Sequence, residues 1–165
     1  MWNPGFAHDA FEAARLDGFH RQFCITSRHY RGTPERPGLV LGLAPGGHCV
    51  GRALGVAAER EAEVLAYLDA REHVGGIYVY DRCRMTVRLL RTGAGVPAWC
   101  YVARPGHPDF AGGLAAEAVQ QTIATATGLA GSNRDYALAT IAHLRALGIA
   151  EPGLEALAAA LGGEA

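Results

Sequence analysis

The sequence predicts an α+β protein in which a mostly antiparallel, curved or barrel-like sheet is followed by helices. Strand-like segments fill the first two thirds of the chain, with one helical segment among them, and three helical segments fill the last third. This segregation is typical of α+β proteins and differs from the alternation of βαβ units. The 165 residues, of which 50% are hydrophobic and 19% are charged, are enough for a single domain over residues 1–165.

The expected strands are short apolar or alternating runs bounded by Gly and Pro. Ala44-Pro45-Gly46-Gly47 is a turn sequence, so the strands on either side of it are expected to form a hairpin. A second strand pair is expected around the Gly/Pro turn at residues 92–97. In order, the predicted strands cover residues 16–27, 39–43, 49–56, 77–80, 86–90 and 98–103.

The expected helices have apolar side chains at helical spacing. Ser132 and Asp135 have the spacing of a helix start, with Ser132 as the N-cap. Glycines end each of the last three helices. Three inner faces are predicted in the last third: Leu114, Ala118, Val119, Thr122 and Ile123; Leu138, Ile141, Ala142 and Leu144; Leu154, Leu157, Ala158 and Leu161. The predicted helices cover residues 59–71, 114–126, 133–147 and 152–161.

Composition excludes several classes of function. A net charge of −1 without a basic block argues against nucleic acid as the partner. No apolar run has the length of a membrane span, and no signal peptide opens the chain. The four cysteines form no CxxC pair, so free thiols in a reducing cytoplasm are favoured over the two disulfides that four cysteines allow.

Common catalytic motifs are also absent from the sequence. There is no Walker loop, GxGxxG or HExxH, and neither Ser27 nor Ser132 lies in a GxSxG elbow. The histidines have no metal-site spacing, and the cysteines lack a nearby histidine at motif spacing. Carboxylate chemistry remains.

Glu72 is the candidate for that chemistry. It follows Leu68 by four residues and Leu65 by seven, so it continues the apolar face of the first helix. A Gly-Gly pair then ends the helix, and Tyr78 follows closely. Desolvation raises the pKa of a carboxyl group, which suits it to proton transfer near neutral pH. The alternative is an exposed Glu72 paired with Arg71.

The polar loop at residues 28–38 is a second candidate site. It holds three arginines and a tyrosine, and its two prolines and two glycines restrict its shape. Arginine suits anionic ligands because its donors form a planar fork that matches a carboxylate. The alternative is a solvated connecting loop.

Four separated motifs then point to a known family. In their order and spacing they resemble the ChaC-like family, the glutathione-specific γ-glutamylcyclotransferases. They are Trp-Asn-Pro-Gly-Phe at residues 2–6, Arg-Gly-Thr-Pro-Glu-Arg-Pro-Gly at 31–38, Leu-Asp-Ala-Arg-Glu at 68–72 with a downstream Gly-x-Tyr, and Gly-Ser-Asn-Arg-Asp-Tyr-Ala-Leu at 131–138.

The resemblance implies a γ-glutamylcyclotransferase-like fold and the cleavage of glutathione to 5-oxoproline and Cys-Gly. It places the family's catalytic acid/base on Glu72 and its pocket tyrosine on Tyr78. Arg31 and Tyr136 lie in family motifs and are predicted to bind substrate. No metal or organic cofactor is implied, and the expected partner is a small-molecule substrate.

One departure from the family pattern concerns the N-terminus. The family has a strand and a Tyr-Gly-Ser-Leu loop directly before the Trp-Asn-Pro segment, whereas here Met1 precedes Trp2. We therefore expect an N-terminally shortened version of an active enzyme. Two alternatives are a catalytically impaired member that binds glutathione or a partner, and a cyclotransferase for another γ-glutamyl compound.

Overall fold

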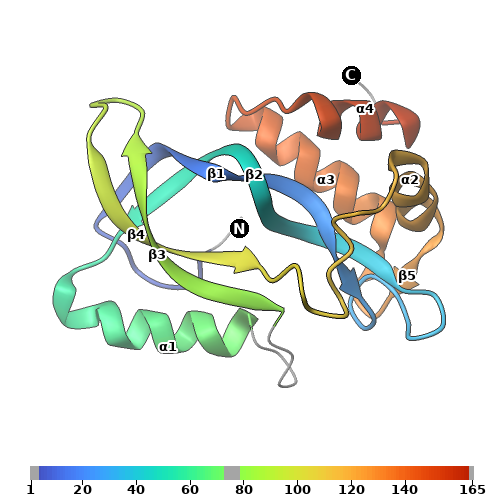
Figure 1. Cartoon of the computed structure of the whole chain (residues 1–165), viewed down its shortest axis with the longest axis horizontal. Coiled ribbons are helices and arrows are strands. Elements are labelled where there is room, and N and C mark those ends of the chain that lie inside the picture. The colour runs from blue at the N-terminus through green and yellow to red at the C-terminus, as the bar shows by residue number, and fades with distance from the viewer. Residues whose placement is uncertain (1–3, 73–78, 164–165) are drawn as a thin grey trace. The chain divides into compact units, whose positions relative to one another are not determined.

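The computed structural model describes residues 4–72 and 79–163 (Figure 1). The chain divides into two compact units. The first unit comprises residues 1–20 and 45–104, and the second comprises residues 21–44 and 105–165. The predicted α+β class is confirmed, while a single domain over the whole chain stays a prediction.

A four-stranded sheet carries the order β2-β1-β3-β4. β3 is antiparallel to both β1 and β4, as the sequence predicted. In the described residues this order is that of an open sheet and not of a closed barrel. β1 and β2 each contribute to both units, since the boundaries fall after His20 and Ala44. The strands are β1 (Ala10–Ser27), β2 (Gly38–Gly55), β3 (Tyr80–Leu89) and β4 (Gly95–Ala103).

The predicted hairpin around residues 44–47 is wrong, because β2 runs through this segment without reversing. Gly46 and Gly47 have φ values of 104° and 64°, which glycine adopts without steric cost. The His20 Nδ1 atom donates a hydrogen bond of 3.0 Å to the Gly46 carbonyl, which ties β2 to β1. The glycines therefore bend a continuous strand that already has a partner.

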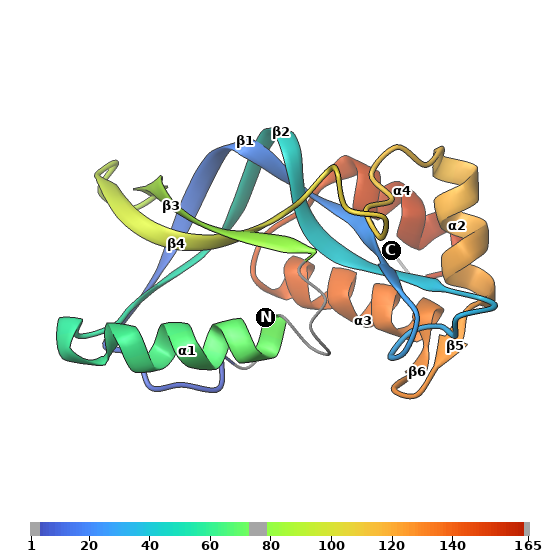
Figure 2. The ribbon, with the colours of Figure 1, turned by 60° about the horizontal axis from the view of Figure 1, so that its bottom comes forward.

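In the first unit, β3 and β4 form an antiparallel ribbon, and α1 (Glu61–Glu72) runs alongside it (Figure 2). A short 3-10 turn, η1 (Ala58–Arg60), precedes α1. Burial alternates with period two over residues 81–89 of β3 and 95–100 of β4, so one face of the ribbon is sheltered there and the other is more exposed. Among the described residues of this unit, the buried apolar ones are Ala14, Leu16, Cys49, Val64, Val79, Val87, Val102 and Ala103.

The second unit holds the three predicted helices and a two-stranded ladder between the first two of them. Ser132 is the N-cap of α3, as predicted, and its Oγ atom accepts a hydrogen bond of 3.0 Å from the Asp135 N–H. The elements are α2 (Ala116–Thr125), β5 (Thr127–Gly128), β6 (Gly131–Ser132), α3 (Asn133–Ala146) and α4 (Pro152–Ala160).

Two predicted core positions of these helices are wrong. Leu114 is 43% exposed because α2 begins only at Ala116, and Ala142 is exposed because α3 turns Ala137 and Thr140 inward instead. Among the described helices, none combines the length and the apolar character needed to cross a membrane.

An ion pair between α3 and α4 is expected to make the stability of the fold depend on pH in the acid range. The Arg145 guanidinium donates to both Glu155 oxygens, and these hydrogen bonds lower the pKa of the Glu155 carboxyl. A lowered folded-state pKa stabilises the fold above the unfolded pKa, and this contribution is lost as pH falls through the folded value. We expect Glu155→Gln to lower the melting temperature at pH 7. The difference from wild type should vanish in strong acid, and a difference that persists there would contradict this assignment.

Candidate active site

Glu72 is the last residue of α1, and its exposure is intermediate. Val64 is buried, while Leu65 and Leu68 on the same helix are half-buried. The helix therefore continues as far as the sequence predicted, and Glu72 is not a fully exposed residue. Tyr78 lies outside the described residues. The proton-transfer role of Glu72 and the substrate contact of Tyr78 stay predictions.

One turn before Glu72, Asp69 joins α1 to the β3–β4 ribbon. The Tyr101 hydroxyl donates to Asp69 Oδ1 at 2.6 Å, and Arg82 Nη1 donates to Asp69 Oδ2 at 2.5 Å. Arg82 and Tyr101 are partners in the strand register, so they point to the same face of the ribbon. Asp69 precedes Glu72 by three residues, which puts both carboxylates on neighbouring positions of one helix face.

The charge of Asp69 also affects Tyr101. Burial and then the hydrogen bond to Asp69 raise the pKa of the Tyr101 hydroxyl above its ordinary value. Tyr101 therefore stays protonated and remains a donor to Asp69 throughout the neutral range. Sequence reasoning missed this contact, because the register that brings Arg82 opposite Tyr101 cannot be read from composition.

The other end of α1 is held by Trp99, whose Nε1–H donates to Glu61 Oε1 at 2.7 Å. The Arg82 guanidinium lies over the Trp99 ring, with its central carbon 5.3 Å from the ring centroid. Contacts at both ends therefore fix the helix along the ribbon. Glu72 thus belongs to a helix that is held to the ribbon near both of its ends, by Glu61 and by Asp69.

In the second unit, the structure brings Arg31 and Tyr136 together, and their contact with substrate stays a prediction. The Arg31 guanidinium lies over the Tyr136 ring at 4.8 Å from the centroid, and its Nη1 atom donates to the Ala130 carbonyl at 2.5 Å. The Phe23 and Tyr136 rings are perpendicular, with their centroids 6.1 Å apart. Stacking and a backbone contact therefore hold the guanidinium in a defined orientation.

The glycines of the Arg31–Gly38 loop allow the backbone to close on itself. A Cβ atom on Gly32 would lie 2.1 Å from the Gly38 nitrogen, and one on Gly38 would lie 2.1 Å from the Arg31 carbonyl oxygen. Both distances are far below van der Waals contact. The loop geometry that presents Arg31 therefore requires glycine at both positions.

Asn133 holds the segments that carry Arg31 and Tyr136 together. It was not identified as a site residue from the sequence. Its side chain is fully buried, accepts a hydrogen bond from the Leu39 N–H at 2.6 Å and donates to the Leu39 carbonyl at 2.7 Å. The amide thus joins the first turn of α3, which carries Tyr136, to the start of β2, which follows the arginine loop. The Asn-Arg-Asp-Tyr motif at residues 133–136 was the available signal.

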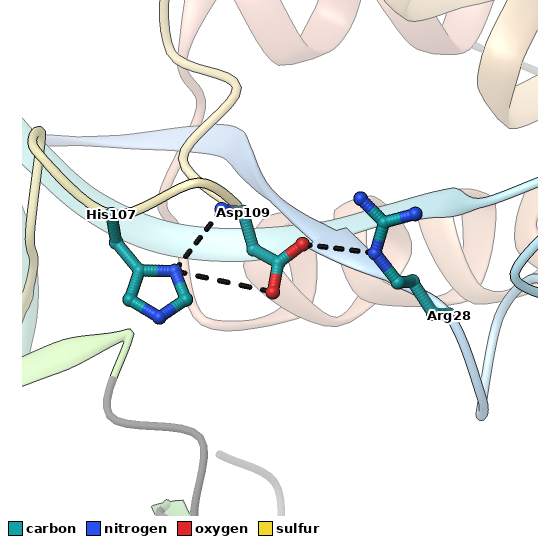
Figure 3. A network of polar contacts seen from close by, with 3 residues as sticks. All are labelled: Arg28, His107 and Asp109. Atoms are coloured by element: carbon teal, nitrogen blue, oxygen red, sulfur yellow. Dashed lines mark hydrogen bonds and ion pairs between the residues drawn. The ribbon is translucent and has the colours of Figure 1, made fainter.

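A third group of polar contacts connects the 104–113 loop to the end of β1 (Figure 3). The Asp109 carboxylate accepts a hydrogen bond of 3.0 Å from Arg28 Nε, and the Asp109 N–H donates to His107 Nδ1 at 3.0 Å. His107 Nδ1 is also 3.9 Å from the second Asp109 oxygen. Backbone bonds from Thr26 N to Asp109 O and from Ala111 N to Cys24 O complete the contact.

The described part of the chain contains no group of three or more His, Cys, Asp or Glu side chains arranged to hold a metal ion. The polar groups of the candidate site are carboxylates, phenols and guanidinium groups. Such groups bind carboxylate ligands and move protons.

The fold of the chain is similar to that of a known class of enzymes. The fold matches a crystal structure of a glutathione-specific gamma glutamyl cyclotransferase from yeast, with a TM-score of 0.78, 21% identity and coverage of 94% of this chain and 88% of that one. At this identity the likeness shows the fold. The fold class predicted from the sequence is therefore confirmed.

Sequence comparison gives the family. The model described as ChaC-like protein matches residues 1–162, so the chain belongs to the ChaC-like family. It is 32% identical over 157 residues to the glutathione-specific gamma-glutamylcyclotransferase of Escherichia coli K12, covering 95% of this chain and 67% of that protein. It is also 32% identical over 142 residues to a rat relative, glutathione-specific gamma-glutamylcyclotransferase 1. That alignment covers 84% of this chain and 63% of the rat protein. The chain thus spans about two thirds of the length of these relatives.

The buried amide of Asn133 makes a prediction about stability. Asn133→Ala leaves the Leu39 N–H and carbonyl without their partners, so we expect the free energy of unfolding to fall by about 2–4 kcal/mol. Ser132→Ala, which removes only the N-cap of the same helix, should cost about 1 kcal/mol. Urea unfolding of both variants measures the difference. A smaller loss for Asn133→Ala than for Ser132→Ala would contradict the structural role given to the amide.

Proposed function

We propose that the chain is a γ-glutamylcyclotransferase that cleaves glutathione to 5-oxoproline and Cys-Gly. The observation that carries this proposal is its alignment, over 95% of its length, with a relative named for that activity. The placement of Glu72 at the end of a helix fixed by Asp69 and Trp99 is consistent with a single acid/base residue. The small-molecule substrate is the only partner that the proposal needs.

The reaction needs one proton carrier. The α-amine nitrogen of the γ-glutamyl group attacks the γ-carbonyl carbon of the same group, and the Glu72 carboxylate accepts the amine proton. The protonated Glu72 then gives this proton to the cysteine nitrogen as the bond from that nitrogen to the γ-carbon breaks. The substrate supplies both reacting groups, so holding it folded provides much of the rate enhancement. No water is consumed.

Arg31 and Tyr136 are proposed to bind the substrate. Glutathione has two carboxylates, and an oriented guanidinium is the side chain best suited to one of them. The contact of Arg31 with the Ala130 carbonyl uses Nη1, while the guanidinium carries further N–H donors at Nε and Nη2. Tyr78 is assigned to the pocket on the family motif alone.

We place the protein in the cytoplasm. Its four cysteines are free thiols in the structure, which suits a reducing compartment. Glutathione in the same compartment would supply the substrate.

Replacement of Glu72 tests the mechanism. Glu72→Gln keeps the size of the side chain and removes its basic oxygen, so we expect release of 5-oxoproline to fall about 10²–10⁴-fold. The matched control is Glu63→Gln, an exposed position on the same helix, which should retain wild-type turnover. Equal activities for the wild type and Glu72→Gln would remove Glu72 from the mechanism.

The same assay examines the substrate. Glutathione is compared with γ-glutamyl amino acids, because two Arabidopsis relatives, 30% and 28% identical, are named gamma-glutamylcyclotransferases 2-1 and 2-3 without a stated substrate. Faster turnover of a γ-glutamyl amino acid would overturn the choice of glutathione. Calorimetric binding of glutathione without product would favour a binding protein instead of an enzyme.

Arg31 is tested by a conservative change. Arg31→Lys keeps the charge but loses the planar fork, so we expect KM for glutathione to rise about tenfold, which corresponds to roughly 1.4 kcal/mol of binding. The value of kcat should change little, because the contact is made equally in the ground state and the transition state. Arg36→Lys in the same loop is the control and should leave both constants unchanged. An unchanged KM for Arg31→Lys would exclude the proposed contact.

A further inference from the structure

Cys83 on β3 and Cys100 on β4 lie directly opposite each other in the antiparallel register. The backbone hydrogen bonds from Arg104 N to Val79 O and from Leu89 N to Ala94 O identify the alternate residue pairs that exchange hydrogen bonds, and the cysteine pair is one of these. Such pairs have Cα atoms about 5.5 Å apart. Disulfides form at Cα separations of about 4.4–6.8 Å, so the Cα spacing lies in this range, and the bond requires the two Cβ atoms to draw together.

The pair is more accessible to solvent than the fully buried Cys24. Both cysteines are half-buried free thiols on the sheltered face of the ribbon. Burial raises the pKa of Cys100, and the neighbouring Cys83 and Cys49 raise it further. Three of the four thiols therefore lie near one another in the first unit. Cys24, in the second unit, is fully buried, and burial raises its pKa to about 11.

We propose that Cys83 and Cys100 form a reversible dithiol–disulfide site whose exchange partner is a small disulfide, namely glutathione disulfide. The Cys83 thiolate attacks one sulfur of glutathione disulfide, breaks its S–S bond and releases one glutathione thiolate. The Cys100 thiolate then attacks the Cys83 sulfur of the mixed disulfide and releases the second glutathione. Two electrons pass from the cysteine pair to the small disulfide, and the two cysteine protons end on the released glutathiones.

The order of the two attacks follows from the environment of Cys100. Burial disfavours the Cys100 thiolate by raising its pKa, so we assign the second attack to Cys100. Once Cys83 is part of a mixed disulfide, its negative charge no longer opposes ionisation of Cys100. The first step therefore favours the second.

The position of the pair connects it to α1. The adjacent register pair is Arg82 and Tyr101, which together hold Asp69 three residues before Glu72. A bond between Cys83 and Cys100 would restrain the two strands beside this contact. One consequence rests on the proposed function: a protein that consumes glutathione would carry a site that responds to its oxidised form.

The test is a redox titration of the whole chain in glutathione and glutathione disulfide. Remaining thiols are alkylated, and the protein is digested with trypsin, which cuts after Arg82 and Arg84 and so separates Cys83 from Cys100. We expect a cross-linked pair of peptides that lacks two hydrogen atoms and disappears on reduction. The oxidised fraction should follow the ratio of glutathione disulfide to the square of the glutathione concentration.

Because turnover would consume glutathione, the titration is repeated in dithiothreitol and its oxidised form, which are not γ-glutamyl compounds. The readout is a covalent bond and not product release. Failure of this proposal is therefore distinguishable from failure of the proposed function.

Single-cysteine variants provide the controls. Cys24→Ser and Cys49→Ser should keep the cross-link, whereas Cys83→Ser and Cys100→Ser should lose it. Circular dichroism shows whether each variant is folded. If a variant does not fold, the cross-link measured in the wild type decides the test. Absence of the cross-link from the oxidised wild type, or a bond from Cys49 to Cys100 in its place, would overturn the proposal.

Discussion

The buried amide of Asn133 is the contact on which the arrangement of the second unit depends. A primary amide has both a donor and an acceptor at its tip, so it satisfies the N–H and the carbonyl of Leu39 together. These groups lie where water cannot replace the amide, and losing it would leave two buried backbone groups unsatisfied. The amide also restrains Arg31 and Tyr136. Tyr136 lies on the first turn of α3, and the loop that holds Arg31 leads into the start of β2.

In the first unit the corresponding constraint is electrostatic and more accessible to solvent. Asp69 receives hydrogen bonds from Tyr101 and Arg82, and Glu61 receives one from Trp99. These contacts contribute less stability than a buried amide because water competes with them. They fix the orientation of α1 instead, and the proton-transfer role proposed for Glu72 at the end of this helix needs a fixed position more than a deep core.

Prediction from the sequence succeeded where the signal is local. The helix start at Ser132 and the ends of the last three helices follow from capping and glycine chemistry within a few residues. It failed at the Pro45-Gly46-Gly47 segment, because the same residues make either a hairpin or a bend in a long strand. The choice depends on whether a neighbouring strand, here β1 at His20, is already paired. The same reasoning explains why Asp69 and Asn133 were missed, since their partners lie 32 and 94 residues away.

The sequence by itself determined the α+β class, through the segregation of strand-like and helical runs, and the family, through four motifs in a fixed order. The candidate residues Glu72, Tyr78, Arg31 and Tyr136 follow from that resemblance and stay predictions. Only the tertiary structure decided the strand register, which places Cys83 opposite Cys100 and aligns Arg82 with Tyr101. It also showed which polar side chains anchor α1 and α3. Register and long-range hydrogen bonds arise from packing between distant segments, and periodicity along a single segment carries no information about its partner.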